Sequence, residues 1–259
     1  MHRNIVLCFV GLLYYSLVGY ALISFDIGSL TSALFLFGAP AYFLARFSAA
    51  PAAVLISVTA FGAGMAFLLE GIAHITGIWY FVGVEELRLF GVIPLEVIAI
   101  SILQTLFLTL LYELVFDDGE YSESHARVRF AALGVFAVGV LLLLSLHLYL
   151  LHGVFFSHSY VWILVTLVGA SLAALSVEKT LTLRFFDRLV LFTCVSAVPL
   201  LVWLLVSVAH TYKVFAYTHD YFYTFTIFGS AIPLEEILLS LAFPLFVATF
   251  YELYLDDGK

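Results

Sequence analysis

The sequence predicts an all-α, polytopic integral membrane protein with about eight transmembrane helices in two tandem, parallel four-helix repeats. The first observation is composition: 64% of the 259 residues are hydrophobic and only 11% are charged, with a mean hydropathy of +1.14. Soluble domains are about half apolar and about a quarter charged, so this composition excludes a soluble globular domain. The second observation is a series of long apolar runs, and the third is an internal repeat.

Apolar runs long enough to cross a bilayer occur along the whole chain. A helix needs about 20 predominantly apolar residues to span the hydrocarbon core. Backbone N–H and C=O groups must be paired inside lipid, so continuous runs of this length are expected to be helical, whereas a barrel would show short alternating strands. The predicted helices cover residues 4–24, 29–47, 51–75, 92–116, 128–151, 159–177, 187–210 and 230–254.

Two sequence motifs are repeated at one common spacing of 139 residues. Pro94-Leu95-Glu96 recurs as Pro233-Leu234-Glu235, and YELVFDDG at 112–119 recurs as YELYLDDG at 251–258. Each repeat then contains four predicted helices. An even number of helices returns the chain to its starting side, so the two copies are expected to share one orientation about an axis near the membrane normal.

The repeats also predict the domain boundaries. The first four-helix repeat covers residues 1–119, the second covers 128–259, and residues 120–127 form a polar cytoplasmic linker. Small residues inside the apolar runs, such as Gly62 and Gly64, are expected to let neighbouring helices pack closely.

The basic residues predict the orientation of the chain in the membrane. Cytoplasmic loops carry the excess of lysine and arginine, and an inside N-terminus satisfies this rule. The outer side then carries only Arg88 and Lys213. We therefore expect a multi-pass protein of the cell membrane with both termini in the cytoplasm. The inner side carries Arg3, Arg46, Arg127, Arg129, Lys179, Arg184, Arg188 and Lys259.

Glu96, Glu235 and Glu236 are carboxylates at the beginning of hydrophobic runs, each just after a proline. Proline suits the first turn of a helix, and a glutamate beside it faces free N–H groups and the positive end of the helix dipole. This helix-start role explains a Pro-x-Glu sequence. It does not explain Glu236, because a second carboxylate in a membrane is costly and usually functional. The three glutamates are candidates for proton transfer.

Two histidines are expected on the same outer side as these glutamates. His74 and His210 end the predicted third and seventh helices, and Glu70 lies one turn before His74 on the same face. They are candidates for a proton relay. An interfacial histidine that bonds a backbone carbonyl group explains the positions equally well.

Gln104 and an aromatic pair complete the polar candidates of the first repeat. Gln104 lies about two turns below Glu96, close to the same face, where it would mark the floor of a pocket. Trp79 and Tyr80 suit either a substrate pocket or the aromatic belt at the membrane surface.

Several kinds of site have no signature in the sequence. No lysine lies in the middle of a predicted helix, so a retinal Schiff base of the rhodopsin kind is excluded, and there is no glycine-rich phosphate loop or dinucleotide motif. No histidine and cysteine cluster has metal spacing, so neither a metal nor a cofactor is expected. Asp117, Asp118 and Glu120 would suit a diphosphate–magnesium site, although solvated acidic loops are commoner.

These motifs resemble the membrane-integral lycopene cyclases of carotenoid biosynthesis, in the fused two-repeat form. The resemblance rests on Gly77-Ile78-Trp79, on Pro94-Leu95-Glu96 and on Pro233-Leu234-Glu235-Glu236. The continuations LQTLFLTLLYE at 103–113 and FPLFVATFYE at 243–252 are also similar to that family. The resemblance covers both repeats and is most specific around the last two helices of each repeat.

The chain departs from the family pattern at three places. Val97 stands where the family has a second glutamate in the first copy, and Glu70 stands where an aspartate usually precedes the Gly-x-Trp element. The second copy has KVFAYT where a tryptophan would be expected. One weakened half, an altered substrate or an altered reaction would each account for these departures.

The resemblance implies an acid-catalysed ring closure of a linear carotenoid end group. A desolvated carboxylic acid protonates a terminal double bond, and a second group removes a proton after the ring closes. Glu235 and Glu236 are expected to divide these two roles, with Glu96 as the matching group of the first half. Aromatic faces would stabilise the carbocation by cation–π attraction, and the candidates are Trp79, Tyr80, Phe90 and Phe228.

The predicted function is therefore cyclisation of lycopene or a related linear carotenoid without a redox cofactor. One alternative is another isoprenoid-modifying membrane enzyme, either a hydratase or a prenyl-transferring elongase. Another is a non-catalytic carotenoid-binding or transport protein. The expected partners are a linear carotenoid drawn from the bilayer and membrane lipids, with a homo-oligomer possible and no nucleic acid.

Overall fold

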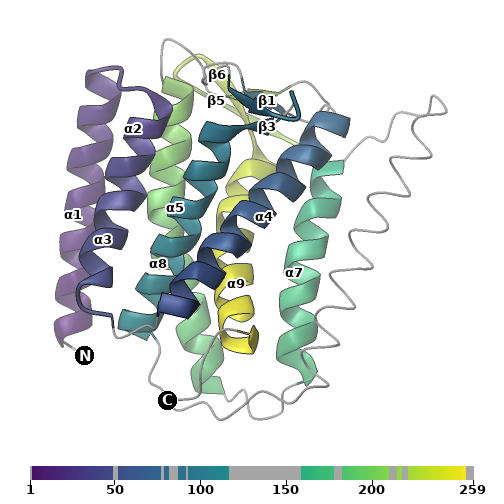
Figure 1. Cartoon of the computed structure of the whole chain (residues 1–259). Helices are drawn as coiled ribbons and strands as arrows, with labels where there is room; N and C mark the ends of the chain where they lie inside the picture. The colour runs from purple at the N-terminus through teal and green to yellow at the C-terminus, as the bar shows by residue number, and fades with distance from the viewer. Residues whose placement is uncertain are drawn as a thin grey trace.

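The computed structural model describes residues 2–48, 52–76, 79–81, 87–91, 93–116, 159–177, 183–209, 215–217 and 221–254. Helices make up most of this part of the chain and lie side by side in a bundle (Figure 1). The start of the first helix and the end of the last lie at one end of the bundle, and the strands lie at the other (Figure 1). The helices are α1 (His2–Ser24), α2 (Ser29–Ala33), η1 (Leu34–Gly38), α3 (Ala39–Ala45), α4 (Ala52–Thr76), α5 (Leu95–Leu111), η2 (Tyr112–Phe116), α7 (Ser159–Val177), α8 (Leu183–Ala209) and α9 (Leu234–Tyr254), where η1 and η2 are π-helical.

Helices cover seven of the eight predicted segments, and the remaining one, 128–151, lies outside the described residues, as does the linker 120–127. Within the described ranges, four helices are long and apolar enough to cross a membrane: Val54–Ala73, Leu95–Phe116, Arg188–Ala209 and Leu234–Glu252. Three further apolar helical stretches are shorter: Phe9–Ser24, Ser29–Ala45 and Ile163–Leu172. The chain is thus mostly helical, with four helices that could span a bilayer.

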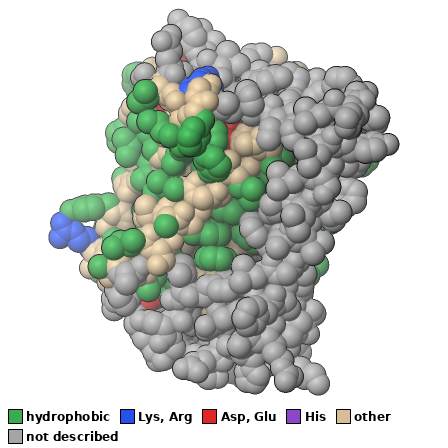
Figure 2. Space-filling model, turned by 45° about the vertical axis from the view of Figure 1, so that its right-hand side comes forward, with side chains coloured by type: hydrophobic (Ala, Val, Ile, Leu, Met, Phe, Trp, Pro, Cys, Tyr) green, Lys and Arg blue, Asp and Glu red, His purple; other side chains and the backbone are tan. Residues whose placement is uncertain are grey.

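The surface of the bundle agrees with an apolar environment. Hydrophobic side chains cover much of the described surface in Figure 2, whereas lysine and arginine side chains show only at one edge and near the strand end. Large apolar side chains on α1, including Phe9, Leu17 and Tyr20, are exposed by more than half of their surface. Exposed apolar area of this extent is rare on soluble monomers and suits contact with lipid.

Three short antiparallel strand pairs were not predicted by the all-α interpretation. They are β1 (Trp79–Phe81) with β4 (Phe215–Tyr217), β2 (Arg88–Leu89) with β3 (Ile93–Pro94), and β5 (Thr224–Ile227) with β6 (Ser230–Pro233). They hold two to four residues each, too few for the alternating pattern that identifies a strand in sequence. The second and third pairs lead directly into α5 and α9, so they position the first turns of these helices.

The hairpins before α5 and α9 share one backbone feature, although the β2–β3 loop has three residues (90–92) and the β5–β6 loop has two (228–229). Phe90 and Phe228 have φ angles of +54° and +51°, and the glycines after them, Gly91 and Gly229, both have φ +73°. In the two-residue β5–β6 loop, consecutive positive φ angles are those of a type I′ turn, which normally carries Asn-Gly. A bulky residue in this region is strained by about 1–3 kcal/mol. Both halves therefore keep a phenylalanine where the backbone disfavours it.

We expect Phe228→Asn to raise the free energy of unfolding by about 1 kcal/mol, because asparagine tolerates positive φ and the ring of Phe228 is 63% exposed. Thermal unfolding of the detergent-solubilised protein measures this. Phe222→Asn is the matched control, since Phe222 is equally exposed, at 66%, outside the turn. A lower melting temperature for Phe228→Asn in lipid would show that contacts of the ring outweigh the strain.

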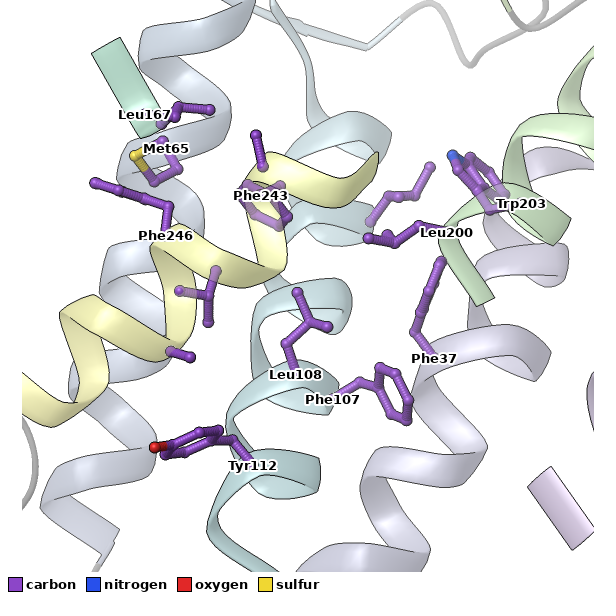
Figure 3. Close-up of a cluster of buried hydrophobic side chains, with 14 of the residues drawn as sticks. Phe37, Met65, Phe107, Leu108, Tyr112, Leu167, Leu200, Trp203, Phe243 and Phe246 are labelled. Atoms are coloured by element: carbon purple, nitrogen blue, oxygen red, sulfur yellow. The ribbon is translucent and has the colours of Figure 1, made fainter. Parts of the chain in front are cut away.

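The core lies where helices of the two sequence halves meet. Phe37 of η1 packs against Phe107 of α5 and Trp203 of α8, with ring centroids 6.0 and 6.2 Å apart (Figure 3). Tyr15 of α1 reaches the same Phe107 ring at 6.2 Å. Lipid tails are as apolar as these side chains, so burial itself provides little drive, and close packing of the rings stabilises the helix contacts instead.

Two tyrosine–glutamate hydrogen bonds join the halves at the end of the bundle opposite the strands. The Tyr112 hydroxyl donates to Glu252 Oε1, and the Tyr251 hydroxyl donates to Glu113 Oε2. The two tyrosines and the two glutamates are each 139 residues apart, so each half supplies the donor of one bond and the acceptor of the other. The two tyrosine rings also pack edge to face, with centroids 6.1 Å apart. Each Tyr-Glu pair of the sequence repeat therefore contacts the other pair.

Tyr112→Phe and Tyr251→Phe are each expected to lower the free energy of unfolding by about 1.5–3 kcal/mol, because each loses a hydrogen bond to a carboxylate at a buried hydroxyl. Chemical unfolding in mixed micelles measures the loss. In a double-mutant cycle, Tyr112→Phe should add almost nothing to Glu252→Leu, since both remove the same bond. Fully additive losses would contradict this assignment.

Candidate functional site

A pocket lies between helices α4, α5, α8 and α9. Its cavity volume is about 130 Å³, which is smaller than the roughly 300–1,000 Å³ of typical small-molecule pockets. The lining residues are Ala66, Leu69 and Glu70 of α4; Val97, Ile100, Ser101 and Gln104 of α5; Leu200, Trp203 and Leu204 of α8; and Glu236, Leu239, Ser240 and Phe243 of α9.

Helices α5 and α9 line the pocket with equivalent faces. The α5 positions 97, 100, 101 and 104 become 236, 239, 240 and 243 when 139 is added, and all eight line the pocket. Residues spaced at i, i+3, i+4 and i+7 share one face of a helix. The α4 and α8 residues each follow an i, i+3, i+4 spacing as well. The two halves therefore contribute corresponding α5 and α9 faces to one pocket, whereas the α4 and α8 lining residues are not at equivalent positions.

The polar groups of the pocket are distributed unequally between the halves. Glu236 of α9 corresponds to Val97, and Gln104 of α5 corresponds to Phe243. Glu70 adds a second carboxyl group from α4. The remaining lining is mostly apolar, with Trp203 and Phe243 supplying aromatic surface.

The two serines of the pocket are engaged by the backbone. Ser101 Oγ donates to the Gly62 carbonyl oxygen at 3.0 Å, and Ser240 Oγ donates to the Glu236 carbonyl oxygen at 3.1 Å. The Ser240 hydroxyl proton is thus used in a hydrogen bond within α9, and the Ser101 hydroxyl proton is used in one between α5 and α4. By their chemistry, Glu70, Gln104 and Glu236 are the lining side chains suited to proton transfer or to polarising a ligand.

Glu96 and Glu235 lie at the starts of α5 and α9 and are not part of the pocket lining. Glu96 is 7% exposed and accepts a hydrogen bond from the Ser29 hydroxyl. Glu235 is 2% exposed, and its Oε1 accepts the Phe222 N–H at 2.9 Å. These bonds tie each helix start to a neighbouring segment. Of the three predicted catalytic glutamates, the structure brings only Glu236 to the pocket.

The aromatic candidates of the sequence lie at the strand end of the molecule. Trp79 and Tyr80 are in β1, where their backbones pair with Tyr217 and Ala216, and their side chains are outside the described residues. The ring of Phe90 is 80% exposed and packs against Phe67 at 6.1 Å. Neither Phe90 nor Phe228 is part of the pocket lining.

Both histidine predictions fall outside what the structure describes. His74 belongs to the last turn of α4, but its side chain is not described, and His210 lies outside the described residues altogether. Asp117, Asp118 and Glu120 also lie outside them. Among the described residues, no group of three or more histidine, cysteine or acidic side chains is placed to hold a metal ion.

Trp203 and Phe243 are pocket residues that the sequence interpretation did not propose. The signal for Phe243 was present, because it is the equivalent of Gln104 at the 139-residue spacing. Trp203 comes from α8 and enters the site only because α8 packs beside α9, which no local pattern reveals.

No protein-family model, curated protein or solved structure matches this chain.

Proposed function

We propose that this chain is a membrane-embedded cyclase of carotenoid end groups, which converts lycopene or a related linear carotenoid to a cyclic product. One observation carries the proposal: two carboxyl groups, Glu70 and Glu236, and the amide of Gln104 line one otherwise largely apolar pocket between helices. An apolar chain suits the lining, and a proton donor with a proton acceptor suits ring closure. The sequence motifs that resemble lycopene cyclases are an independent reason for this choice.

The proposal includes eight transmembrane helices in two parallel repeats with both termini in the cytoplasm. The reciprocal Tyr112–Glu252 and Tyr251–Glu113 bonds support a two-fold relation between the halves. The β1–β4 pairing also supports this relation. Tyr80 lies six residues after His74, and Ala216 lies six residues after His210, so they are equivalent positions, and they are opposite each other in the two strands. Arg46 and Arg188 lie at the helix ends opposite the strands, as a cytoplasmic side there requires.

The reaction requires only proton movements and carbon–carbon bond formation. Protonation of a terminal double bond produces a tertiary carbocation, which a neighbouring double bond attacks to close the ring. Trp203 and Phe243 are the aromatic groups in the pocket that would stabilise this cation by cation–π attraction. Loss of a proton from the ring restores a neutral product with the same elemental composition as the substrate.

Expression of the chain in a lycopene-accumulating bacterium, with chromatography of the extracted pigments, tests this function. We expect a cyclic carotene of unchanged mass. Acyclic pigment in cells whose membranes contain the protein refutes the cyclase. Addition of water or of a prenyl group would indicate a hydratase or an elongase, and unchanged pigment bound to the purified protein would indicate a binding or transport protein.

A further inference from the structure

We infer that the protein has one composite reaction centre shared by its two halves, in which Glu236 and Glu70 form the proton-transferring pair. This inference rests on the proposed cyclisation and defines its geometry. It replaces the sequence-based pairing of Glu235 with Glu236, and it assigns one acidic group to each half of the chain.

The lining of the pocket argues for a single centre. A site built inside one repeat would recur in the other repeat at the 139-residue spacing. This pocket instead uses both members of four equivalent pairs: 97 with 236, 100 with 239, 101 with 240 and 104 with 243. If the first half took the place of the second and the second that of the first, α5 and α9 would still line the same pocket. The α5 and α9 sides of this cavity are therefore common to the two halves and are not duplicated by the repeat.

The residues at equivalent positions differ between the halves, so the two sides of the shared pocket are chemically different. At the level of Glu236 the opposite helix has Val97, and at the level of Gln104 it has Phe243. A glutamate at 97 as well as at 236 would add a third carboxyl group to a cavity that already contains Glu70, and like charges there resist joint ionisation. Valine at 97 leaves a single carboxyl group at this level, and Glu70 supplies the second from α4. The pocket thus distinguishes a proton donor from a proton acceptor.

The proton balance of the cycle follows from these two groups. Glu236, as the carboxylic acid, gives its proton to the terminal C=C, which forms a C–H bond and leaves a carbocation. The internal C=C attacks the cation and forms the ring C–C bond. Glu70, as the carboxylate, removes a proton from the ring carbon beside the new cation, which forms the ring double bond. Return of this proton from Glu70 to Glu236 resets the pair, so no co-reactant is consumed.

A single centre also determines the order of products. A linear carotene has two identical ends, and one pocket treats one end at a time. A product with one ring must therefore form before a product with two rings, and it must be able to leave and rebind. Two pockets that held both ends of one carotene at the same time would not impose this order.

The test uses the full-length protein in lipid nanodiscs with a limiting amount of enzyme. In the wild type, we expect one-ring product first and two-ring product only after a lag. Glu70→Gln should lower the rate by about 100-fold or more, as loss of an acid–base group does, and Glu70→Asp should recover part of it. Size-exclusion profiles verify that each variant is folded.

A relocation variant tests the shared pocket directly. Glu236→Val should be inactive, and adding Val97→Glu to it should restore at least about a tenth of the wild-type rate, because position 97 faces the same cavity. A folded Glu70→Gln with wild-type rate, or two-ring product without a preceding one-ring product, overturns this inference while the cyclase function stands. Absence of cyclic product from the wild type instead refutes the proposed function.

Discussion

Glu236→Gln is expected to lower cyclisation by about 10²–10⁴-fold with little change in the amount of folded protein in the membrane. Glutamine keeps the size and the hydrogen-bonding shape of the side chain but has no proton to give. Glu236 lines the pocket in the first turn of α9, so the loss acts at the reacting end group. The rate of cyclic product formation per unit of membrane protein measures it.

Glu235→Gln is the matched control for this prediction, because it makes the same change one residue earlier. The amide oxygen of glutamine can still accept the Phe222 N–H, and Glu235 is not part of the pocket lining. We expect cyclisation within about tenfold of the wild type, with any loss explained by a lower content of folded protein. Equal losses in both variants would contradict the assignment of Glu236 as the proton donor and Glu235 as a helix-start residue.

The contrast between these neighbours shows what a sequence motif can predict. Pro-Leu-Glu-Glu identifies a helix start and two carboxyl groups, and α9 begins at Leu234 directly after the proline. Successive residues of a helix point about 100° apart, since 3.6 residues complete a turn, so only one glutamate can face a given pocket. Which one does so depends on the helices packed around α9. Those neighbours lie far along the chain and leave no local signal.

The valine at position 97 illustrates the same limit. In the sequence it resembles a missing catalytic residue, and the first half resembles a weakened site. In the structure, Val97 and Glu236 face one cavity, so the difference between the copies becomes a difference between two sides of one pocket. Glu96 and Glu235 occur in both copies, and each accepts a hydrogen bond from a segment outside its own helix.

The helix segments themselves were predictable because lipid leaves the backbone few choices. Predicted boundaries such as 159–177 agree with Ser159–Val177 of α7. The short strands could not be predicted, since their pairing depends on contacts between loops. The packing role of small residues was predictable only as a class: Gly62 and Gly64 have similar surroundings in sequence, but only Gly62 meets another helix.

Gly62→Leu is expected to destabilise the protein by about 3 kcal/mol and to abolish activity. A Cβ at Gly62 would lie 2.9 Å from Thr105 Oγ1 and 3.1 Å from Ile102 Cα on α5. The second of these is a backbone atom and cannot move without shifting α5. The Gly62 carbonyl oxygen also accepts the Ser101 hydroxyl at 3.0 Å, which would be lost if the helices separate. Small residues allow such close approach between helices in a membrane.

Gly64→Leu provides the control, because no atom lies within 4 Å of a Cβ at Gly64 and the position is exposed. Leucine favours helix over glycine by roughly 0.5–1 kcal/mol, so this variant should be as stable as the wild type or slightly more stable. Thermal unfolding and size-exclusion chromatography compare the stability and the folded state of the two variants. Equal behaviour of the two would show that α4 and α5 do not meet at Gly62. The difference extends to the site, because α4 carries Glu70 and α5 carries Gln104, and a wedge between these helices moves these two lining residues apart.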